Sequence, residues 1–181
     1  SADDVFSAGT NYADHMDMRV FDEFRYDTGN APLKELYQRY YKSIYASNLV
    51  ITYVDPAAST VMARCVAEAR VLRAYCHMMA ALTFQRPPKV DKLLGADDKP
   101  TNVESQKSLL EWCASECEEA VNDLDSRKGP NDVEGAFKVT KGFAYFVAGK
   151  SAVFAGDMAR AERNLKPLVE SPNYALVPGN R

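Results

Sequence analysis

The chain has 181 residues, of which 46% are hydrophobic and 26% charged, and its formal net charge at pH 7 is −3. This length allows one domain with a sizeable core, and the composition is that of a folded protein rather than a disordered one. The chain has no basic stripe that would indicate nucleic-acid binding. No apolar run approaches the ~20 residues that a membrane-spanning helix needs.

The first 32 residues are predicted to form a segment of their own, with one short helix followed by a loop. Within this segment, the stretch ADHMDM gathers Asp14, His15 and Asp17. Their spacing fixes no ligand geometry, and such clusters commonly solvate a surface. We therefore expect neither a metal ion nor a cofactor.

Two long helices are predicted next. Apolar and tyrosine side chains at spacings of three and four residues predict the first helix over Leu33–Val54. Asp55 and the proline after it match an N-cap and a first helical position, so the second helix is predicted to begin there. It should end near Phe84, ahead of a double proline. This second helix is apolar on several sides, which indicates a helix packed between layers.

Two arginines, Arg70 and Arg73, fall on this second helix. An isolated buried charge is costly, so a guanidinium group on a buried helix face needs a counter-charge. We expect both arginines to pair with carboxylates.

A loop over Lys89–Pro100 precedes the third predicted helix. Thr101 and Glu104 have the spacing of a capping box, which predicts that this helix begins at Thr101. Gly129 and the proline after it should end the helix.

The last two helices are predicted to form a hairpin, over Phe137–Ala155 and Met158–Glu170, with a tight turn at Gly156–Asp157. Small residues should let the two helices approach closely while aromatic residues fill the flanks: Ala144, Ala148, Ala152, Ala159 and Ala161 are the small ones, and Tyr145, Phe146 and Phe154 the aromatic ones. Helix pairs of this tetratricopeptide type bury their faces only against neighbouring pairs.

The stretch AYFVAGKS, Ala144–Ser151, fits a permissive form of the phosphate-binding loop. Such a loop needs a flexible, glycine-rich turn between a strand and a helix. Here the helical period places the stretch in the middle of a helix, with its amide groups already committed. We therefore reject nucleotide binding.

Four cysteines occur, and none belongs to a CxxC motif: Cys65, Cys76, Cys113 and Cys117. All four fall on or beside apolar helix faces. We interpret them as small buried hydrophobic residues rather than disulfide partners or metal ligands.

Four segments, taken in order, resemble the SusD/RagB family of outer-membrane nutrient-binding lipoproteins. They are LKELYQRYYKSIYASNLVI, AEARVLRAYCHMMAALTFQRPPKV, SQKSLLEWCASECEEAVNDL and KVTKGFAYFVAGKSAVFAGDMARAERNLKPLVESPNYAL. The resemblance covers about Leu33 to Leu176. It implies an all-α fold of stacked, tetratricopeptide-like helical hairpins, with residues 1–32 as an N-terminal segment and loop, 33–176 as the helical scaffold and 177–181 as a tail.

The resemblance also implies a function. Proteins of this family are not enzymes; they sit on the cell-surface side of the outer membrane and dock onto a SusC-like TonB-dependent transporter to capture glycans or other nutrients. The family's lipid-bearing cysteine is absent before Cys65, so the anchor is expected upstream of Ser1. The family is also several times longer than this chain, which leaves open a fragment or a short relative.

The loop VFDEFRYDTGNAP, Val20–Pro32, precedes the first scaffold helix, where the family has part of its glycan face. Flat aromatic rings and planar polar groups suit sugar binding. The candidate ligand-binding residues are therefore Phe24, Arg25, Tyr26, Asp27 and Asn30. An alternative role for the aromatic residues is to pin the loop to the helices.

A second function remains open on sequence grounds: a tetratricopeptide-like adaptor that binds a peptide in a concave groove. Tyrosines of the first long helix could line such a groove, although tyrosines at helical spacing more often belong to a core.

Overall fold

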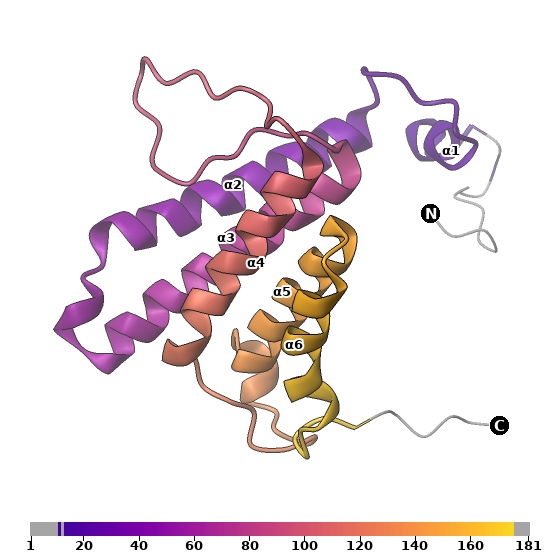
Figure 1. Ribbon diagram of the computed structural model, residues 1–181. Coiled ribbons are helices and arrows are strands. Elements are labelled where there is room, and N and C mark those ends of the chain that lie inside the picture. Colours follow the sequence, from indigo (N-terminus) through magenta and orange to yellow (C-terminus); the bar gives the residue numbers. More distant parts are fainter. Residues whose placement is uncertain (1–10, 12, 176–181) are drawn as a thin grey trace, which may run out of the picture. The chain divides into compact units, whose positions relative to one another are not determined.

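The computed structural model describes residue 11 and residues 13–175 (Figure 1). The predicted tail, 177–181, lies outside the described residues. The regular elements are α1 (Met16–Asp22), α2 (Ala31–Tyr53), η1 (Pro56–Ala58), α3 (Thr60–Phe84), α4 (Gln106–Ala120), η2 (Val121–Asp123), η3 (Gly135–Phe137), α5 (Lys141–Ala155) and α6 (Met158–Val169). Within the described ranges, the one β-type pairing is an isolated bridge between Pro88 and Asn102.

The chain divides into two compact units, residues 1–41 and residues 42–181. The first unit contains α1, the loop after it and the beginning of α2. In this unit the rings of Tyr37 and Tyr41, one turn apart on α2, have centroids 4.5 Å apart.

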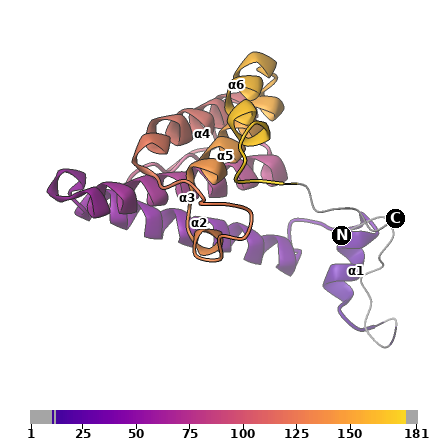
Figure 2. The ribbon, with the colours of Figure 1, turned by 90° about the horizontal axis from the view of Figure 1, so that it is seen from below.

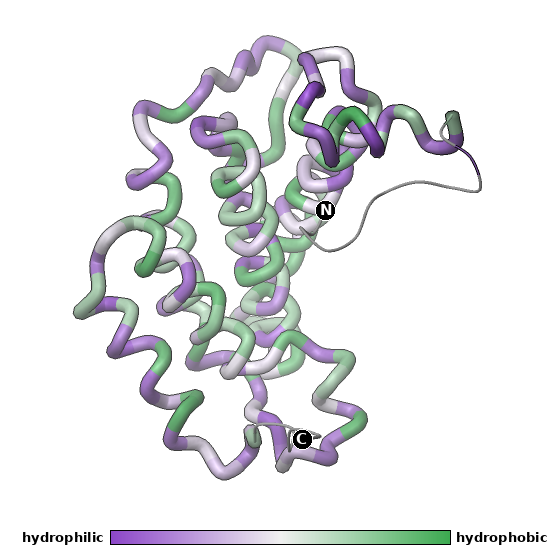
Figure 3. The backbone as a smooth tube through the Cα atoms, turned by 90° about the vertical axis from the view of Figure 1, so that its right-hand side faces the viewer, coloured by the Kyte–Doolittle hydropathy of each residue, from purple (hydrophilic) through white to green (hydrophobic). Residues whose placement is uncertain are grey.

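The second unit is a stack of helices. From α3 to α6, each long helix packs against the next one in the chain (Figures 1 and 2). In Figure 3, hydrophobic residues recur along the helical turns. The fully buried side chains that join α3, α4 and α5 include Val71, Met78, Leu109, Leu110, Cys113 and Val147. The all-α, tetratricopeptide-like fold predicted from the sequence is confirmed.

Helix α3 contacts η1, α4 and α5. This confirms the prediction that it packs between layers. Its beginning differs from the prediction. Asp55 caps the short η1, its side chain accepting the N–H of Ala57, and α3 begins after a second cap at Ser59. The prediction of one continuous helix from Asp55 is therefore wrong by one turn.

Helix α4 begins at Gln106 rather than at Thr101, so the predicted capping box is wrong. Ser105 is the N-cap, and its Oγ accepts the N–H of Ser108 at 3.0 Å. The residues after Thr101 are extended because Asn102 pairs with Pro88 in the isolated bridge. The helix ends at Ala120, well before Gly129.

The hairpin of α5 and α6 forms as predicted, but α5 begins at Lys141 instead of Phe137. Gly156 ends α5 with φ of 82°, a left-handed conformation that glycine adopts without strain. Asp157 caps α6 by accepting the N–H of Arg160 at 2.9 Å.

The predicted alanines Ala144, Ala148 and Ala152 are buried, and a glycine adds to the close approach of α5 and α6. A Cβ atom built on Gly149 would lie 2.5 Å from Cγ of Leu165, so α6 packs directly on the backbone of α5 there. Ala161 is buried, but Ala159 is exposed, and so are the predicted flank residues Phe146 and Phe154. The stretch Ala144–Ser151 lies wholly within α5.

The cysteines follow the prediction with one exception. Cys76, Cys113 and Cys117 are buried free thiols, whereas Cys65 is exposed. Burial raises the pKa of Cys113 and Cys117 thiols, so both stay protonated at neutral pH.

Candidate functional site

The loop that follows α1 carries the predicted ligand-binding residues. Helix α1 ends in a Schellman motif: the N–H of Phe24 donates to the carbonyl oxygen of Phe21 at 3.1 Å, and the N–H of Arg25 donates to that of Val20 at 2.8 Å. This motif requires a left-handed residue, usually glycine, and here that residue is Phe24, with φ of 56°. Its ring is 81% exposed.

Tyr26 is the second aromatic residue of this loop. Its ring centroid lies 5.1 Å from that of Phe21, so one part of the ring packs against the end of α1. The side chain is nevertheless 45% exposed. Both aromatic residues of the prediction therefore present ring surface to solvent.

The two predicted charged residues are exposed and make local contacts. Nε of Arg25 donates to Glu23 at 2.8 Å, in an exposed ion pair. Oδ1 of Asp27 accepts the N–H of Gly29 at 2.8 Å, which closes the turn before α2.

Asn30 differs from the other four candidates, since it is only 6% exposed. Its Oδ1 accepts the N–H of Leu33 at 3.1 Å and so caps α2. Its Nδ2 donates to the carbonyl oxygen of Asp17 on α1 at 3.0 Å. Asn30 thus fixes the loop between α1 and α2. Saccharide contact by Phe24, Arg25, Tyr26 and Asp27 stays a prediction.

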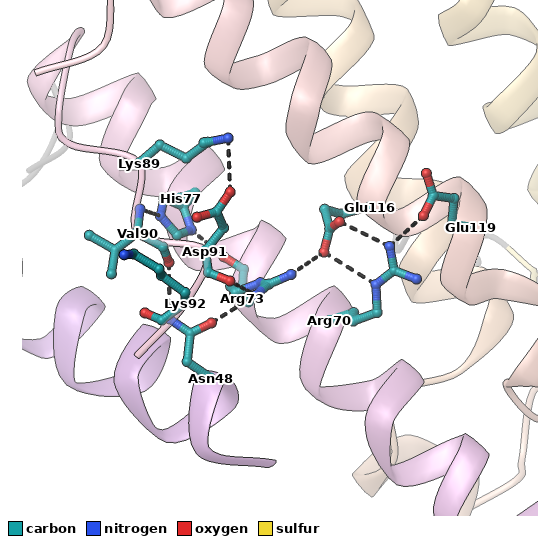
Figure 4. A network of polar contacts seen from close by, with 10 residues as sticks. All are labelled: Asn48, Arg70, Arg73, His77, Lys89, Val90, Asp91, Lys92, Glu116 and Glu119. Carbon is teal, nitrogen blue, oxygen red and sulfur yellow. Dashed lines mark hydrogen bonds and ion pairs between the residues drawn. The ribbon is translucent and has the colours of Figure 1, made fainter. Parts of the chain in front are cut away.

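In the second unit, a network of polar contacts centres on Arg73 (Figure 4). This buried guanidinium group contacts Glu116 of α4 at 2.5 Å and Oδ1 of Asn48 at 2.7 Å, and it donates to the carbonyl oxygen of Asp91 at 2.6 Å. Glu116 also contacts Arg70 at 2.9 Å. The predicted pairing of both arginines with carboxylates is confirmed.

Glu116 is ionised in this arrangement. Burial alone would raise the pKa of its carboxyl group, but the hydrogen bonds from Arg70 and Arg73 outweigh it and lower the pKa. Two cations and one carboxylate are thereby held between α3 and α4.

His77 extends the network towards the loop after α3. Its Nδ1 lies 2.9 Å from the carbonyl oxygen of Arg73, and its Nε2 accepts the N–H of Val90 at 3.0 Å. The edge of the ring faces Trp112, with centroids 5.0 Å apart. These contacts connect α3 to the following loop, while Nε of Arg73 is buried without a hydrogen-bond partner among the described residues.

A cleft of about 420 Å³ lies where the loop after η2 meets the first turn of α5 and the end of α6. Phe143, Phe146 and Leu168 give it an apolar wall, and Tyr174 closes one side. Tyr174 reaches this position because position 142 is a glycine: a Cβ atom there would lie 1.9 Å from the Tyr174 hydroxyl oxygen. Two smaller cavities adjoin the cleft.

Sequence reasoning missed this cleft. Phe146 was assigned to the flanks of the hairpin, and neither Phe143 nor Tyr174 was singled out. The signal that was present is Gly142, an isolated glycine in a helical pattern, which commonly marks a close approach of another group.

Other site types find little support among the described residues. No three or more histidine, cysteine, aspartate or glutamate side chains gather in positions suited to a metal ion; in the ADHMDM stretch, Asp14 instead accepts hydrogen bonds from Asn11. Within the same part of the chain, no helix has both the length and the apolar character to cross a membrane.

Comparison with known proteins places these features in context. No family model and no curated protein matches the sequence. Solved structures do match. A SusD-like carbohydrate-binding protein from Bacteroides fragilis is 25% identical with a TM-score of 0.72, over 81% of this chain and 29% of that protein.

Two further structures share the fold at lower identity. Surface glycan-binding protein A from Bacteroides uniformis is 20% identical with a TM-score of 0.79, over 93% of this chain and 38% of that protein. A laminarin-binding SusD-like protein is 16% identical with a TM-score of 0.75, over 88% of this chain and 34% of that protein. The chain therefore spans about a third of the length of the proteins it matches. The resemblance read from its sequence is confirmed, and the chain has the fold of SusD-like proteins.

Proposed function

We propose that this chain is a saccharide-binding, non-catalytic component of an outer-membrane uptake system, to which it contributes mainly the helical scaffold. The observation that carries the proposal is its similarity to the SusD-like carbohydrate-binding protein of Bacteroides fragilis over 81% of its length. The laminarin-binding SusD-like protein shares the same fold and supports the same ligand class.

The loop after α1 supports this proposal physically. An aromatic side chain in a left-handed backbone conformation costs about 1–3 kcal/mol, and such strain tends to accumulate at binding sites. At Phe24 the strained residue directs an 81% exposed ring into solvent, which contributes almost nothing to packing. An exposed ring of this kind suits stacking against the C–H face of a sugar.

The proposal includes a partner and a location. By its likeness to SusD-like proteins, the chain would act on the cell-surface side of the outer membrane, in complex with a SusC-like TonB-dependent transporter. Co-purification of the tagged chain with a transporter encoded beside it tests this part.

Saccharide binding is tested by isothermal titration calorimetry with laminarin oligosaccharides and xylogluco-oligosaccharides. Phe24→Ala and Tyr26→Ala are expected to weaken binding about ten-fold, the effect of losing one aromatic stacking contact of about 1.4 kcal/mol. Phe137→Ala is the matched control, since Phe137 is 86% exposed but lies on η3. Peptide binding without any saccharide binding would support the adaptor alternative instead.

The absence of catalysis is tested on the same samples. Saccharides incubated with the protein should be recovered unchanged by chromatography. Shortened products that persist in independently purified preparations would contradict a purely binding role.

A further inference from the structure

The first turn of α5 faces the 420 Å³ cleft with hydrogen-bond donors that have no partner. The N–H of Lys141 donates to the carbonyl oxygen of Asp125 at 2.9 Å, and that of Ala144 donates to Thr140. The N–H groups between them, on Gly142 and Phe143, donate to no other group of the described chain. Both residues line the cleft.

Thr140 provides a second and independent observation. It occupies the N-cap position of α5, where a threonine side chain normally accepts an N–H of the first turn, but it forms no such bond. The residue is only 5% exposed, and its side chain hydrogen-bonds to no described residue. It lines both the cleft and the adjoining cavity of about 250 Å³. The Thr140 hydroxyl group is therefore available to form a hydrogen bond with a ligand in the cleft.

The charge of the cleft favours an anion. None of the described residues that line it is acidic, whereas Arg127 and Lys138 are cationic. Arg127 forms no ion pair with a described carboxylate; it donates to the carbonyl oxygen of Asp132 at 3.0 Å and lies over the ring of Tyr174. The partial positive charge at the N-terminus of the 15-residue α5 adds to this field.

The acidic residues nearby are already engaged. In the adjoining cavity, Glu134 pairs with Lys138 at 2.5 Å, and Asp125 pairs with Arg64 at 2.8 Å. Asp132 accepts the N–H groups of Lys128 and Gly135. Each of these carboxylates therefore already has a partner of its own.

The rest of the cleft is apolar and aromatic. Phe143 and Phe146 are stacked, with ring centroids 6.3 Å apart, and Leu168 and Tyr174 continue this wall. A free inorganic anion would leave the wall in contact with water. A sugar that carries a carboxylate would instead place its C–H faces on the wall and its charge on the helix end.

We propose that this cleft binds an acidic saccharide, with the carboxylate of a uronic acid accepting hydrogen bonds from the Thr140 hydroxyl and the N–H groups of Gly142 and Phe143. Its volume suits one or two sugar rings. The proposal takes its ligand class from the proposed saccharide binding, but it concerns residues other than those of the loop after α1.

The test compares two disaccharides that differ in one group. Cellobiouronic acid carries a carboxylate where cellobiose carries a hydroxymethyl group. In calorimetry on the intact chain, the acid is expected to bind about ten-fold more tightly, because its carboxylate accepts charge-assisted hydrogen bonds that the hydroxymethyl group of cellobiose does not. In NMR spectra, the amide signals of Gly142 and Phe143 should shift during titration. Equal affinity for both sugars, or no shift, would overturn the proposal.

Variants locate the binding. Thr140→Val removes the hydroxyl group with little change in volume. It should lower the affinity for cellobiouronic acid about ten-fold without changing the affinity for cellobiose. Thr83→Val makes the same change on an exposed turn of α3 and should have no effect. Lys138→Met, a surface substitution, should also lower the affinity for cellobiouronic acid. This second variant keeps the test valid if Thr140→Val does not fold. Unchanged affinity in folded Thr140→Val or in Lys138→Met would count against the site.

Sodium sulfate serves as the free-anion probe. It should displace cellobiouronic acid but bind more weakly, because it makes no contact with the apolar wall. Sulfate that binds as tightly as the acid would show an anion site alone and overturn the saccharide assignment. Phe24→Ala and Tyr26→Ala should leave the acid's affinity unchanged, so failure of this proposal and failure of the loop's proposed role give different results.

Discussion

Nε2 of His77 accepts the backbone N–H of Val90 at 3.0 Å. Because Nε2 is an acceptor, the ring proton lies on Nδ1, which donates to the carbonyl oxygen of Arg73 at 2.9 Å. Burial, opposed only in part by this hydrogen bond, lowers the pKa of His77 to about 4. The nearby charges have mixed effects, since Arg73 and Lys89 lower the pKa and Asp91 raises it. His77 is therefore neutral at pH 7 and connects α3 to the following loop.

The first prediction concerns pH. Below about pH 6.5 the unfolded chain takes up a proton at His77 that the folded chain does not accept until about pH 4. The free energy of unfolding should therefore fall by about 2 kcal/mol between pH 7 and pH 5 from this group alone. Urea unfolding at pH 7 and at pH 5 measures this decrease in the free energy of unfolding.

Two variants isolate this histidine. His77→Gln, which does not titrate, should lose most of the decrease between pH 7 and pH 5, whereas His15→Asn, at an exposed position, should keep it. The same decrease in His77→Gln as in the wild-type chain would mean that another group causes it.

The second prediction concerns Glu116, the carboxylate shared by Arg70 and Arg73. Glu116→Ala leaves the buried Arg73 without a counter-charge and should lower the free energy of unfolding by about 3–5 kcal/mol. Glu119→Ala is the control, because Glu119 contacts the same Arg70 but its side chain is 66% exposed. It should cost less than about 1 kcal/mol. Similar losses in both variants would show that burial of the pair is not what matters.

The scaffold could be predicted from the sequence because its signals are local and repeated. Apolar spacing along α3 and the Gly156–Asp157 turn each specify an element without reference to distant residues. The pairing of Arg70 and Arg73 with carboxylates could also be predicted, because an unpaired buried charge is costly. The sequence did not indicate that Glu116 is the shared partner.

The errors occurred where two local signals compete or where a distant segment decides. Thr101 and Ser105 both have the chemistry of an N-cap, and the bridge between Asn102 and Pro88 favours the second. Likewise, Asp55 and Ser59 are both caps, and each starts its own helical piece.

The candidate sites were harder still. Periodicity indicates which face of α5 is apolar, but not that Tyr174 folds back against Gly142 and forms one side of a cleft. In the loop after α1, the sequence indicated aromatic content. It did not indicate that Asn30 is internal or that Phe24 occupies the left-handed position of a Schellman motif.

The third prediction concerns Gly149, which resembles part of a phosphate-binding loop in sequence but packs against Leu165 in the structure. Gly149→Ala should lower the free energy of unfolding by about 1–3 kcal/mol through overpacking, despite the higher helix propensity of alanine. Adding Leu165→Ala should make the alanine at 149 less costly, which a double-mutant cycle measures. Additive effects would contradict direct contact. Gly129→Ala, with nothing within 4 Å of the new Cβ atom, is the control.

The fourth prediction concerns Asn30, which we expect to position the loop rather than contact a saccharide. Asn30→Ala removes the cap of α2 and the contact to α1, so it should cost about 1 kcal/mol and speed amide hydrogen exchange in α1 and in the first turn of α2. Asn30→Asp retains the capping oxygen and should restore most of the protection in α2. Unchanged exchange in Asn30→Ala together with weaker saccharide binding would instead indicate direct contact.

The fifth prediction sets stability against binding at Phe24. Phe24→Gly relieves the left-handed strain at the end of α1, so it should stabilise this region by about 0.5–1 kcal/mol and slow amide exchange in α1. Phe24→Ala removes the same ring but retains the strained conformation, so it should not bring that gain. Both variants should bind laminarin oligosaccharides about ten-fold more weakly, because both lose the exposed ring. If Phe24→Gly binds as tightly as the wild-type chain, the exposed ring of Phe24 has no role in saccharide capture.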